Sequence, residues 1–401
     1  MPGFRKSLLH LLVLVVHLGS LTQAGDWPQI LGPQRNGVAE NETLLERWPD
    51  AGPMELWQCA AGSGFAGVSV AGERVAFFCR EGDAEVMRLL DAATGREFWA
   101  SRSACQYRGG VSSDKGPRCV PLIDGNHVYL FGVEGLLRCL SLTDGSEIWK
   151  VDTNQEFSPL EGYFGVGSTP VIHDQLLIVN VGGRDDAAVV AFDKASGRTV
   201  WKTGQDHASY SSPIAATLEG RVHVLVLTRL HLWSLDPSSG QLRFQMAFGK
   251  RGPTVNGATP VVVGNDVFVS ASYGVGALLA RVNGPTASEV WRDEDLLATQ
   301  YATPVLVAGR LYAVDGRQDA GPGSARVRCI DLTRQRVLWE QSGFDYGSLV
   351  SVGRDLLFLT CGGELIRFEA SPEKYREIQR AVVLSGTDRG YRLPALSRGR
   401  L

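Results

Sequence analysis

Cysteines, metal-binding patterns and catalytic motifs are scarce in this chain of 401 residues. Its seven cysteines are odd in number and scattered, which excludes a disulfide-rich scaffold. Its seven histidines form no H-E-x-x-H motif, and its cysteines form no C-x-x-C pair; both spacings are typical of zinc sites. The sequence also has no G-x-S-x-G nucleophile elbow and no Walker or dinucleotide glycine pattern. We therefore predict no catalytic residue and no metal ligand.

An excess of charge of one sign is also lacking. The chain has 40 basic and 43 acidic residues, a formal net charge of −3. It contains no basic run or polybasic patch, so nucleic-acid binding is disfavoured and nothing in the sequence indicates an anionic lipid partner. The acidic pair Asp185-Asp186 lacks the further oxygen ligands at set spacing that calcium requires.

One apolar stretch stands out, Leu8–Leu18, between the basic residues Arg5 and Lys6 and a small-residue site at Ala24. It is too short to span a bilayer comfortably, so residues 1–24 are predicted to be a cleaved secretory signal, with an uncleaved anchor as the alternative. No cysteine follows it, so a lipoprotein signal is not supported. Cleavage leaves 38 basic and 43 acidic residues, a charge of −5. The mature chain, 25–401, is expected in the periplasm or outside the cell, without a transmembrane segment.

What the sequence has in abundance is an internal repeat. An Asp, Asn or Ser stands eight residues before each of six closing aromatics, and the first four units also have a glycine four residues before it. This spacing is typical of a β-hairpin, because the polar side chain caps the turn and glycine supplies a positive φ. A further strand pair such as Thr169–Val181, often led by Thr-Pro or Ser-Pro, precedes the hairpin. The aromatics, with Trp57 added, are predicted to pack between neighbouring units: Trp57, Trp99, Trp149, Trp201, Phe244, Trp291 and Trp339.

Units of this length holding four antiparallel strands are typical of β-propeller blades. Aligned strand starts number eight: Val68, Pro121, Pro170, Pro213, Pro260, Pro304, Leu349 and Pro394. The sequence therefore predicts an all-β fold, an eight-bladed β-propeller of four-stranded antiparallel blades whose last blade is incomplete, so that the chain could be a fragment. Met54–Cys59 is expected to pair with the last sheet and close the ring. In the alternative, seven blades close the ring and Ser371–Gly386 replaces the seventh hairpin.

Polar and aromatic residues near the starts of the innermost strands form a candidate binding face, because such side chains gather at the mouths of ring-shaped proteins. They are Arg118, Tyr163, Tyr210, Asn256, Tyr273, Tyr301 and Tyr346. Cys105 and Cys119 flank one of these loops and could be bridged in an oxidising compartment.

The units "LDAATGREFW", "FDKASGRTVW" and "LDPSSGQLRF", with the entry "DWPQILGPQRNGV", resemble the repeats of the PQQ-like β-propeller family over roughly residues 26–401. Ala191, Asp193, Gly197 and Trp201 fit the family's docking motif best, with Ser196 in place of Thr. The resemblance implies a disc of eight blades and one of two functions. Quinoprotein dehydrogenases bind pyrroloquinoline quinone (PQQ) at the centre, whereas the lipoprotein BamB and its relatives are protein-binding scaffolds without a cofactor. The chain lacks both the Cys-Cys pair of the alcohol dehydrogenases and the lipobox of BamB.

The resulting hypothesis is an exported, monomeric, non-enzymatic propeller that binds a protein, peptide or glycan on one face of the disc, without a cofactor. The alternative is an oxidoreductase that uses PQQ with calcium, or a degenerate relative of one. A third possibility is a lyase or hydrolase whose residues carry no recognisable motif.

Overall fold

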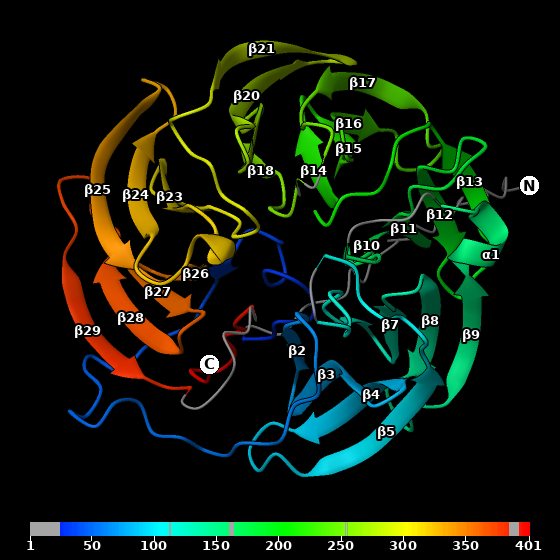
Figure 1. The fold of residues 1–401 in the computed structure, drawn as a ribbon, viewed down its shortest axis with the longest axis horizontal. Helices are drawn as coiled ribbons and strands as arrows, with labels where there is room; N and C mark the ends of the chain where they lie inside the picture. Colours follow the sequence, from blue (N-terminus) through cyan, green and yellow to red (C-terminus); the bar gives the residue numbers. More distant parts are fainter. Residues whose placement is uncertain (1–24, 112–113, 160–163, 253, 255, 385–392) are drawn as a thin grey trace, which may run out of the picture.

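The computed structural model describes residues 25–111, 114–159, 164–252, 254, 256–384 and 393–401, which form a disc of β-sheets around a central axis (Figure 1). Seven sheets, numbered 1 to 7 in chain order, each contain four consecutive antiparallel strands. In each sheet the chain passes from the innermost strand outward. The short strand β1 (Val38–Ala39) adds to sheet 7, parallel to its innermost strand. The predicted all-β propeller of four-stranded antiparallel blades is confirmed.

The strands of sheets 1 to 4 are β2 (Val68–Ala71), β3 (Arg74–Glu81), β4 (Ala84–Asp91) and β5 (Glu97–Ala104); β6 (Leu122–Asp124), β7 (His127–Phe131), β8 (Leu136–Ser141) and β9 (Glu147–Asp152); β10 (Val171–His173), β11 (Leu176–Asn180), β12 (Val189–Asp193) and β13 (Thr199–Thr203); and β14 (Ile214–Leu218), β15 (Arg221–Leu227), β16 (His231–Leu235) and β17 (Leu242–Ala247). Those of sheets 5 to 7 are β18 (Val261–Val263), β19 (Asp266–Ala271), β20 (Gly276–Asn283) and β21 (Thr286–Asp293); β22 (Val305–Val307), β23 (Arg310–Asp315), β24 (Ala325–Asp331) and β25 (Arg336–Phe344); and β26 (Gly347–Val352), β27 (Asp355–Thr360), β28 (Glu364–Glu369) and β29 (Glu377–Val382).

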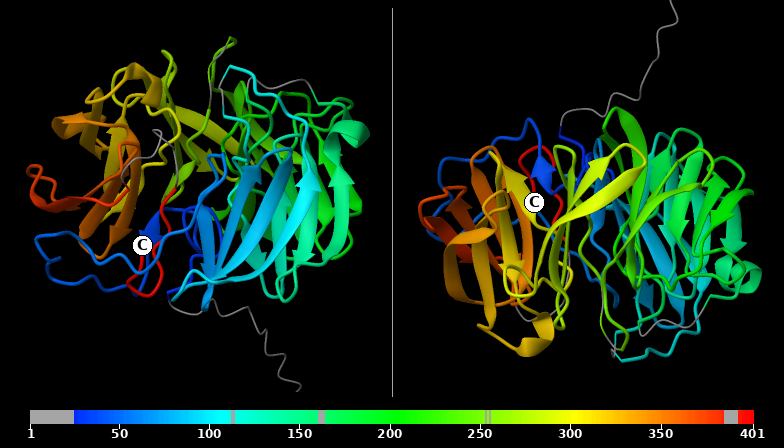
Figure 2. Two further views of the ribbon diagram at one scale, coloured as in Figure 1. Left: turned by 60° about the horizontal axis from the view of Figure 1, so that its bottom comes forward. Right: turned by 90° about the horizontal axis from the view of Figure 1, so that it is seen from above.

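Two short helices interrupt the connections, α1 (Thr153–Phe157) after β9 and η1 (Gln318–Ala320) between β23 and β24. Within the described ranges, no helix has the length and hydropathy needed to cross a bilayer. The turns that join the first strand to the second, and the third to the fourth, lie on one face of the disc, the turn face. The loops that lead into the innermost strands lie on the opposite face, the loop face, together with η1 (Figure 2).

The repeated Asp and Gly shape the outer hairpin of each sheet. In sheet 3, Asp193 Oδ1 accepts hydrogen bonds from Ser196 N at 2.9 Å and Ser196 Oγ at 2.6 Å. Gly197 then turns the chain with a φ of +72°, a conformation that glycine adopts without a steric penalty. A register shift between Ala191 and Phe192 follows, and an equivalent shift occurs between the two outer strands of every sheet. This bulge determines which residue of the outermost strand faces the next sheet.

That residue is a large aromatic in sheets 1 to 6, and it docks on the outer hairpin turn of the next sheet. Trp201 of sheet 3 covers Gly240 of sheet 4 and donates its indole N–H to Pro237 O at 3.0 Å. Equivalent bonds of 2.7–3.2 Å join five further indoles to the following sheet, those of Trp57, Trp99, Trp149, Trp291 and Trp339. Phe244 has no donor and packs with Val282 and Ala287 of sheet 5. Each indole therefore buries its ring while its only polar group stays hydrogen-bonded.

The Thr-Pro and Ser-Pro pairs join the innermost strands around the axis. Val120 N donates to Thr169 Oγ1, Thr169 N to Ser212 Oγ, and Thr259 N to Thr303 Oγ1, each at 2.9 Å. Each hydroxyl thus binds the backbone N–H at the equivalent position of the preceding sheet. Since an unpaired buried N–H would cost about 1–3 kcal/mol, these hydroxyls stabilise the narrow centre of the ring.

Residues 26–39, the hub segment, connect the innermost strands of several sheets. Trp27 forms a bridge with Val70 of sheet 1, and Pro28 O accepts a hydrogen bond from Ile123 N of sheet 2. Gly37 lies against Val305 of sheet 6, and β1 then pairs with β26 of sheet 7. The hub segment therefore occupies the centre of the disc.

Arg35 anchors the middle of the hub segment. Its buried guanidinium donates to Pro213 O at 2.7 Å and to the carbonyl oxygens of Thr169 and Pro170. Nε donates to Gln29 Oε1 at 2.7 Å. Burial lowers the pKa of the guanidinium to about 9. The hydrogen bonds that compensate this charge inside the ring thus come from carbonyl and amide oxygens.

Between sheets 7 and 1 the ring closes without an eighth ladder in the described part of the chain (Figure 1). Gln379 of β29 stands where the other outermost strands carry their aromatic. Its side-chain amide accepts from Trp48 N at 2.7 Å and donates to Trp48 O at 3.0 Å. Trp48, Ala395 and Leu396 pack with core residues of both sheets. Segments from both ends of the described chain therefore close the ring.

Three sequence expectations are corrected by this closure. The described residues form seven sheets, as in the alternative, and not eight. Ser371–Gly386 does not replace a hairpin, because its middle part is strand β29. Met54–Cys59 forms no strand with the last sheet; Trp57 docks instead on Ala92 O in the outer turn of sheet 1. Around Pro394 the described residues contain only an isolated Ser397–Arg400 bridge. Between sheets 7 and 1, side-chain packing takes the place of an eighth ladder in the described residues.

We expect Gly240→Ala to lower the free energy of unfolding more than Gly264→Ala. Both glycines have a positive φ, +71° and +62°, so the backbone penalty is similar. A β-carbon on Gly240 would lie 2.7 Å from Trp201 Cδ2, whereas nothing lies within 4 Å of one on Gly264. The additional loss should be about 1–3 kcal/mol by urea denaturation, because the indole must move. Equal losses would show that Trp201 does not sit on this turn.

Candidate functional site on the loop face

The residues of the predicted binding face lie on the loop face in two groups, except Tyr163, which lies outside the described residues. Arg118, Tyr210 and Asn256 belong to the loops leading into sheets 2, 4 and 5. Tyr273, Tyr301 and Tyr346 belong to the turns and loops of sheets 5, 6 and 7.

Arg118 holds the long loop between β5 and β6. Its guanidinium lies 5.4 Å from the ring centroid of Phe65 and 5.9 Å from that of Tyr107, and 3.7 Å from Asp114. The side chain is only 8% exposed, and burial lowers its pKa. Cation–π contacts of this kind stabilise a loop when the cation is desolvated. Arg118 therefore supports the face from below and presents little surface to a ligand.

Tyr210 and Asn256 tie neighbouring loops together. The hydroxyl of Tyr210 accepts a hydrogen bond from Phe164 N at 2.8 Å, and burial raises its pKa to about 12. Asn256 is buried, and its Nδ2 donates to Thr228 O and Arg229 O at 2.9 and 3.0 Å. The ring of Tyr210 remains partly exposed.

Tyr346 organises the loop that leads into sheet 6. Its hydroxyl accepts hydrogen bonds from the backbone N–H groups of Gln300, Tyr301 and Ala302 at 2.9–3.0 Å and lies 2.7 Å from Thr299 Oγ1. The side chain is buried, which raises the pKa of its hydroxyl to about 12. Tyr346 therefore sets the position of Tyr301 rather than lining the surface itself.

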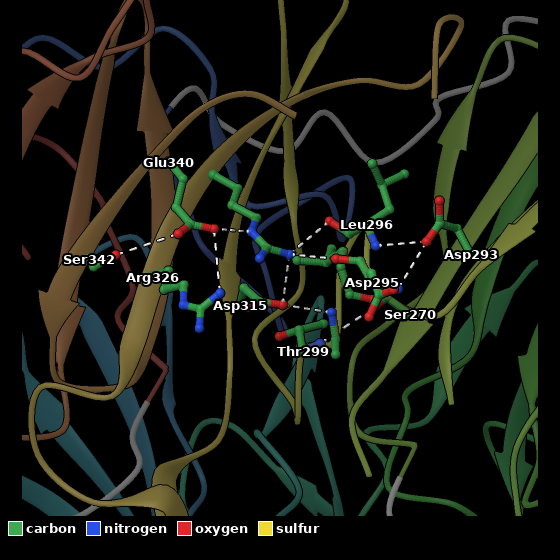
Figure 3. Close-up of polar contacts among 12 residues, drawn as sticks. Ser270, Asp293, Asp295, Leu296, Thr299, Asp315, Arg326, Glu340 and Ser342 are labelled. Carbon is green, nitrogen blue, oxygen red and sulfur yellow. Dashed lines mark hydrogen bonds and ion pairs between the residues drawn. The ribbon is translucent and has the colours of Figure 1, made fainter. Parts of the chain in front are cut away.

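A polar network fixes the same loop from the side of sheets 5 and 6 (Figure 3). Arg328 Nε donates to Glu340 Oε2 at 2.7 Å, and its Nη1 lies 3.2 Å from Asp315 Oδ1. The same Nη1 donates to Asp295 O and Leu296 O at 2.8 and 3.0 Å. Burial raises the pKa of the Asp315 carboxyl. The loop is thus held at its start by Arg328 and at its end by Tyr346.

Tyr273 of the predicted face packs with Arg317, which was not predicted from the sequence, and both side chains are partly exposed. The Arg317 guanidinium lies 4.7 Å from the Tyr273 ring centroid. The Tyr273 hydroxyl accepts a hydrogen bond from Gln300 Nε2 at 2.6 Å, and the Tyr301 hydroxyl donates to Gln318 Oε1 at 2.5 Å. Half-exposed Tyr and Arg side chains held in fixed positions are typical of protein-binding hot spots.

Sequence analysis missed a buried charged cluster under the loop face between sheets 1 and 2. Glu85 of β4 is 3% exposed, and its Oε1 accepts a hydrogen bond from Val133 N at 2.8 Å. Burial raises the pKa of this carboxyl to about 7. Arg80 donates nearby to Cys105 O at 2.9 Å. Cys105 and Cys119 are both buried and unbridged. The alternation of β4 predicts that Glu85 faces inward, and that was the only available signal.

The centre of the disc does not fit a quinone held by calcium. Arg35 and the hub segment already occupy the axis, and the described residues contain no group of three His, Cys, Asp or Glu side chains placed to bind a metal. A cavity of about 60 Å³ beside the hub segment is lined by Trp27, Pro33 and Leu396. This is well below the roughly 300 Å³ at which ligand pockets begin. The loop face is therefore better suited to a macromolecular surface than to an enclosed cofactor.

Comparisons with known proteins point to one family. The family model described as outer membrane protein assembly factor BamB matches residues 82–341. The outer membrane protein assembly factor BamB of Burkholderia pseudomallei (strain K96243) is 24% identical over 310 residues, which cover 66% of this chain and 75% of that protein.

Solved structures show the shared fold. BamB from Moraxella catarrhalis superimposes with a TM-score of 0.57 and 17% identity, covering 79% of this chain and 85% of that one. Quinohemoprotein alcohol dehydrogenase from Comamonas testosteroni gives a TM-score of 0.60 and 13% identity, covering 90% and 73%. At these identities the structures show the fold alone, so they do not distinguish a scaffold from an enzyme.

We expect Glu85→Gln to be increasingly more stable than the wild type as the pH rises. The folded pKa of about 7 lies above the ordinary 4.5, so the stability that the protonated carboxyl contributes is present below about pH 4.5 and is lost as the pH rises through 7. Glutamine keeps the acceptor for Val133 N. The difference in unfolding free energy between variant and wild type should rise by up to about 3 kcal/mol between about pH 5 and pH 8. A pH-independent difference would contradict the burial of a titrating carboxyl.

Proposed function

We propose that this chain, which belongs to the family of outer membrane protein assembly factor BamB, is an exported scaffold that binds a protein partner on its loop face. In this proposal residues 1–24 direct export, and the disc acts in the periplasm or outside the cell as a monomer. The family membership carries the proposal, because the relatives are named as outer membrane protein assembly factors.

The construction of the loop face supports this function. The described residues of its loops are held by buried side chains such as Arg118, Asn256 and Tyr346. Partly exposed side chains, including Tyr210, Tyr273 and Arg317, then rise from a rigid base. Rigid presentation lowers the entropic cost of binding. A peptide or a glycan could contact the same side chains, but the family favours a protein.

No cofactor takes part in the proposed function. The hub segment around Arg35 occupies the axis. The described residues contain no group of three His, Cys, Asp or Glu side chains that could hold a calcium ion. Dye-linked alcohol oxidation after addition of pyrroloquinoline quinone and calcium would contradict this part of the proposal and favour the oxidoreductase alternative.

We expect Tyr273→Ala/Arg317→Ala to lose cross-linking to the partner in the cell envelope by about tenfold or more, as for a hot spot. The partner is first identified by mass spectrometry of cross-links to the wild-type protein. Phe98→Ala/Arg96→Ala is the matched control, because Arg96 stacks on Phe98 at 5.4 Å on the outer rim of sheet 1.

Both variants should have melting temperatures close to each other, which separates binding from folding. Retained cross-linking in the loop-face variant, or an equal loss in the rim variant, would show that the partner does not use the loop face.

A further inference from the structure

Basic side chains gather on the turn face of sheets 6 and 7, where four separate turns bring them together. Arg310 lies at the inner turn of sheet 6, and Arg354 at that of sheet 7. The outer turns of the two sheets add Arg334, Arg336, Lys374 and Arg376. We call these six residues the basic turn patch.

Contacts between the two sheets make the patch continuous. Trp339 of sheet 6 donates its indole N–H at 2.7 Å to Ser371 O, at the start of the outer turn of sheet 7. Tyr375 in that turn packs edge-on against Trp339 with ring centroids 5.9 Å apart. Ala370 N donates to Arg354 O at 2.7 Å, which joins the inner and outer turns of sheet 7. The four turns therefore form one connected surface.

The positive charge of this surface is only partly neutralised. Asp331 lies 3.5 Å from Arg310 and 3.8 Å from Arg334, and Glu369 lies 3.2 Å from Arg376. Glu373 stands in the outer turn of sheet 7 and bonds to Ser371. Within the described ranges Arg336, Arg354 and Lys374 are exposed, and no ion pair is recorded for them. Asp355 and Glu377 also lie in these turns, where they pair with Arg367 and Arg380 outside the patch. The four turns thus contain five acidic and six basic residues.

Inner turns elsewhere on the turn face contain acidic residues. The inner turns of sheets 1, 3 and 4 contain Glu73, Asp174 and Glu219, and those of sheets 1 and 4 also end on a basic residue, Arg74 and Arg221. Glu73 pairs with Arg398 and Arg400. Charges on those turns are therefore mixed, although the chain as a whole has a net charge of −3.

The chain also enters the disc on this face. Gly25 O accepts a hydrogen bond from Ser397 Oγ, and Arg398 pairs with Glu73 in the inner turn of sheet 1. Gly25, the first described residue, therefore lies at the turn face.

We propose that the basic turn patch adsorbs the protein to an anionic phospholipid surface, so that the turn face lies against the bilayer and the loop face points away from it. This inference goes beyond the proposed function, because it needs no particular partner on the loop face. Clustered Lys and Arg side chains bind anionic headgroups through charge alone.

The composition of the patch favours lipid over an acidic protein. No large apolar side chain of its four turns is among the exposed ones in the described residues, whereas the centre of a protein interface is apolar. Tyr375, the aromatic residue of the sheet 7 outer turn, packs against Trp339 and Phe368 inside the fold. The patch therefore offers exposed charge without an anchor for a protein partner.

The test measures whether a protein of residues 25–401, which contains the whole described fold, sediments together with phospholipid vesicles. Vesicles of phosphatidylcholine alone are compared with equal mixtures of phosphatidylcholine and phosphatidylglycerol. The test variant is Arg336→Glu/Arg354→Glu/Lys374→Glu. The matched control is Lys115→Glu/Arg184→Glu/Arg251→Glu, which makes the same charge change at exposed residues of the loop face.

We expect the wild type and the control to bind the anionic vesicles about tenfold or more tightly than the test variant. Binding should be weak on neutral vesicles and should be lost at about 1 M salt, where charges are screened within about 3 Å. Equal binding to neutral and anionic vesicles, or equal loss in both variants, would overturn the proposal. A further contradicting result would be binding to polyglutamate that depends on the patch, in the absence of binding to anionic vesicles. The surface would then recognise an acidic polypeptide.

Discussion

The docking of an indole on the turn of the next sheet is the interaction on which the rest of this structure depends. A sheet of four strands has two apolar faces and cannot bury both alone, so it needs a neighbour on each side. The indole brings the two sheets into contact at their outer edges, and the Thr-Pro hydroxyls do so near the axis. A sheet that is held both at its outer edge and near the axis also holds the ends of its loops in place. The ordered loop face, and therefore the candidate binding site, follows from this repeated contact.

Closure of the ring uses the same positions with different chemistry. Gln379 replaces the aromatic of the last sheet and binds both polar backbone groups of Trp48, as a strand partner would. Trp57 docks on sheet 1 although no sheet precedes it. The hub segment then links the innermost strands, and its buried Arg35 bonds to sheets 3 and 4. The axis of the disc is therefore taken up by the chain itself.

Much of the fold could be predicted from the sequence, because the Asp, Gly and aromatic spacing is local and repeats. The closure could not, because Gln379 and Trp48 are 331 residues apart and neither has a periodic signal. The position of the candidate site residues on the loop face could be predicted, because they stand close to the starts of the innermost strands. Their burial could not be predicted. Arg118 and Tyr346 turned out to support loops, since side chains from other sheets cover them. The basic turn patch was invisible in the sequence, where its members stand in separate turns and form no run.

A double-mutant cycle between Trp201→Ala and Gly240→Ala tests the docking interaction most directly, because it isolates the contact between the indole and the turn. With the ring removed, the methyl group at position 240 no longer meets Trp201. We therefore expect the double variant to lose, beyond Trp201→Ala alone, only the backbone penalty of the positive φ at position 240, with a coupling energy of about 1 kcal/mol or more. Strictly additive losses would contradict the account, because they would mean that these two residues of neighbouring sheets do not touch.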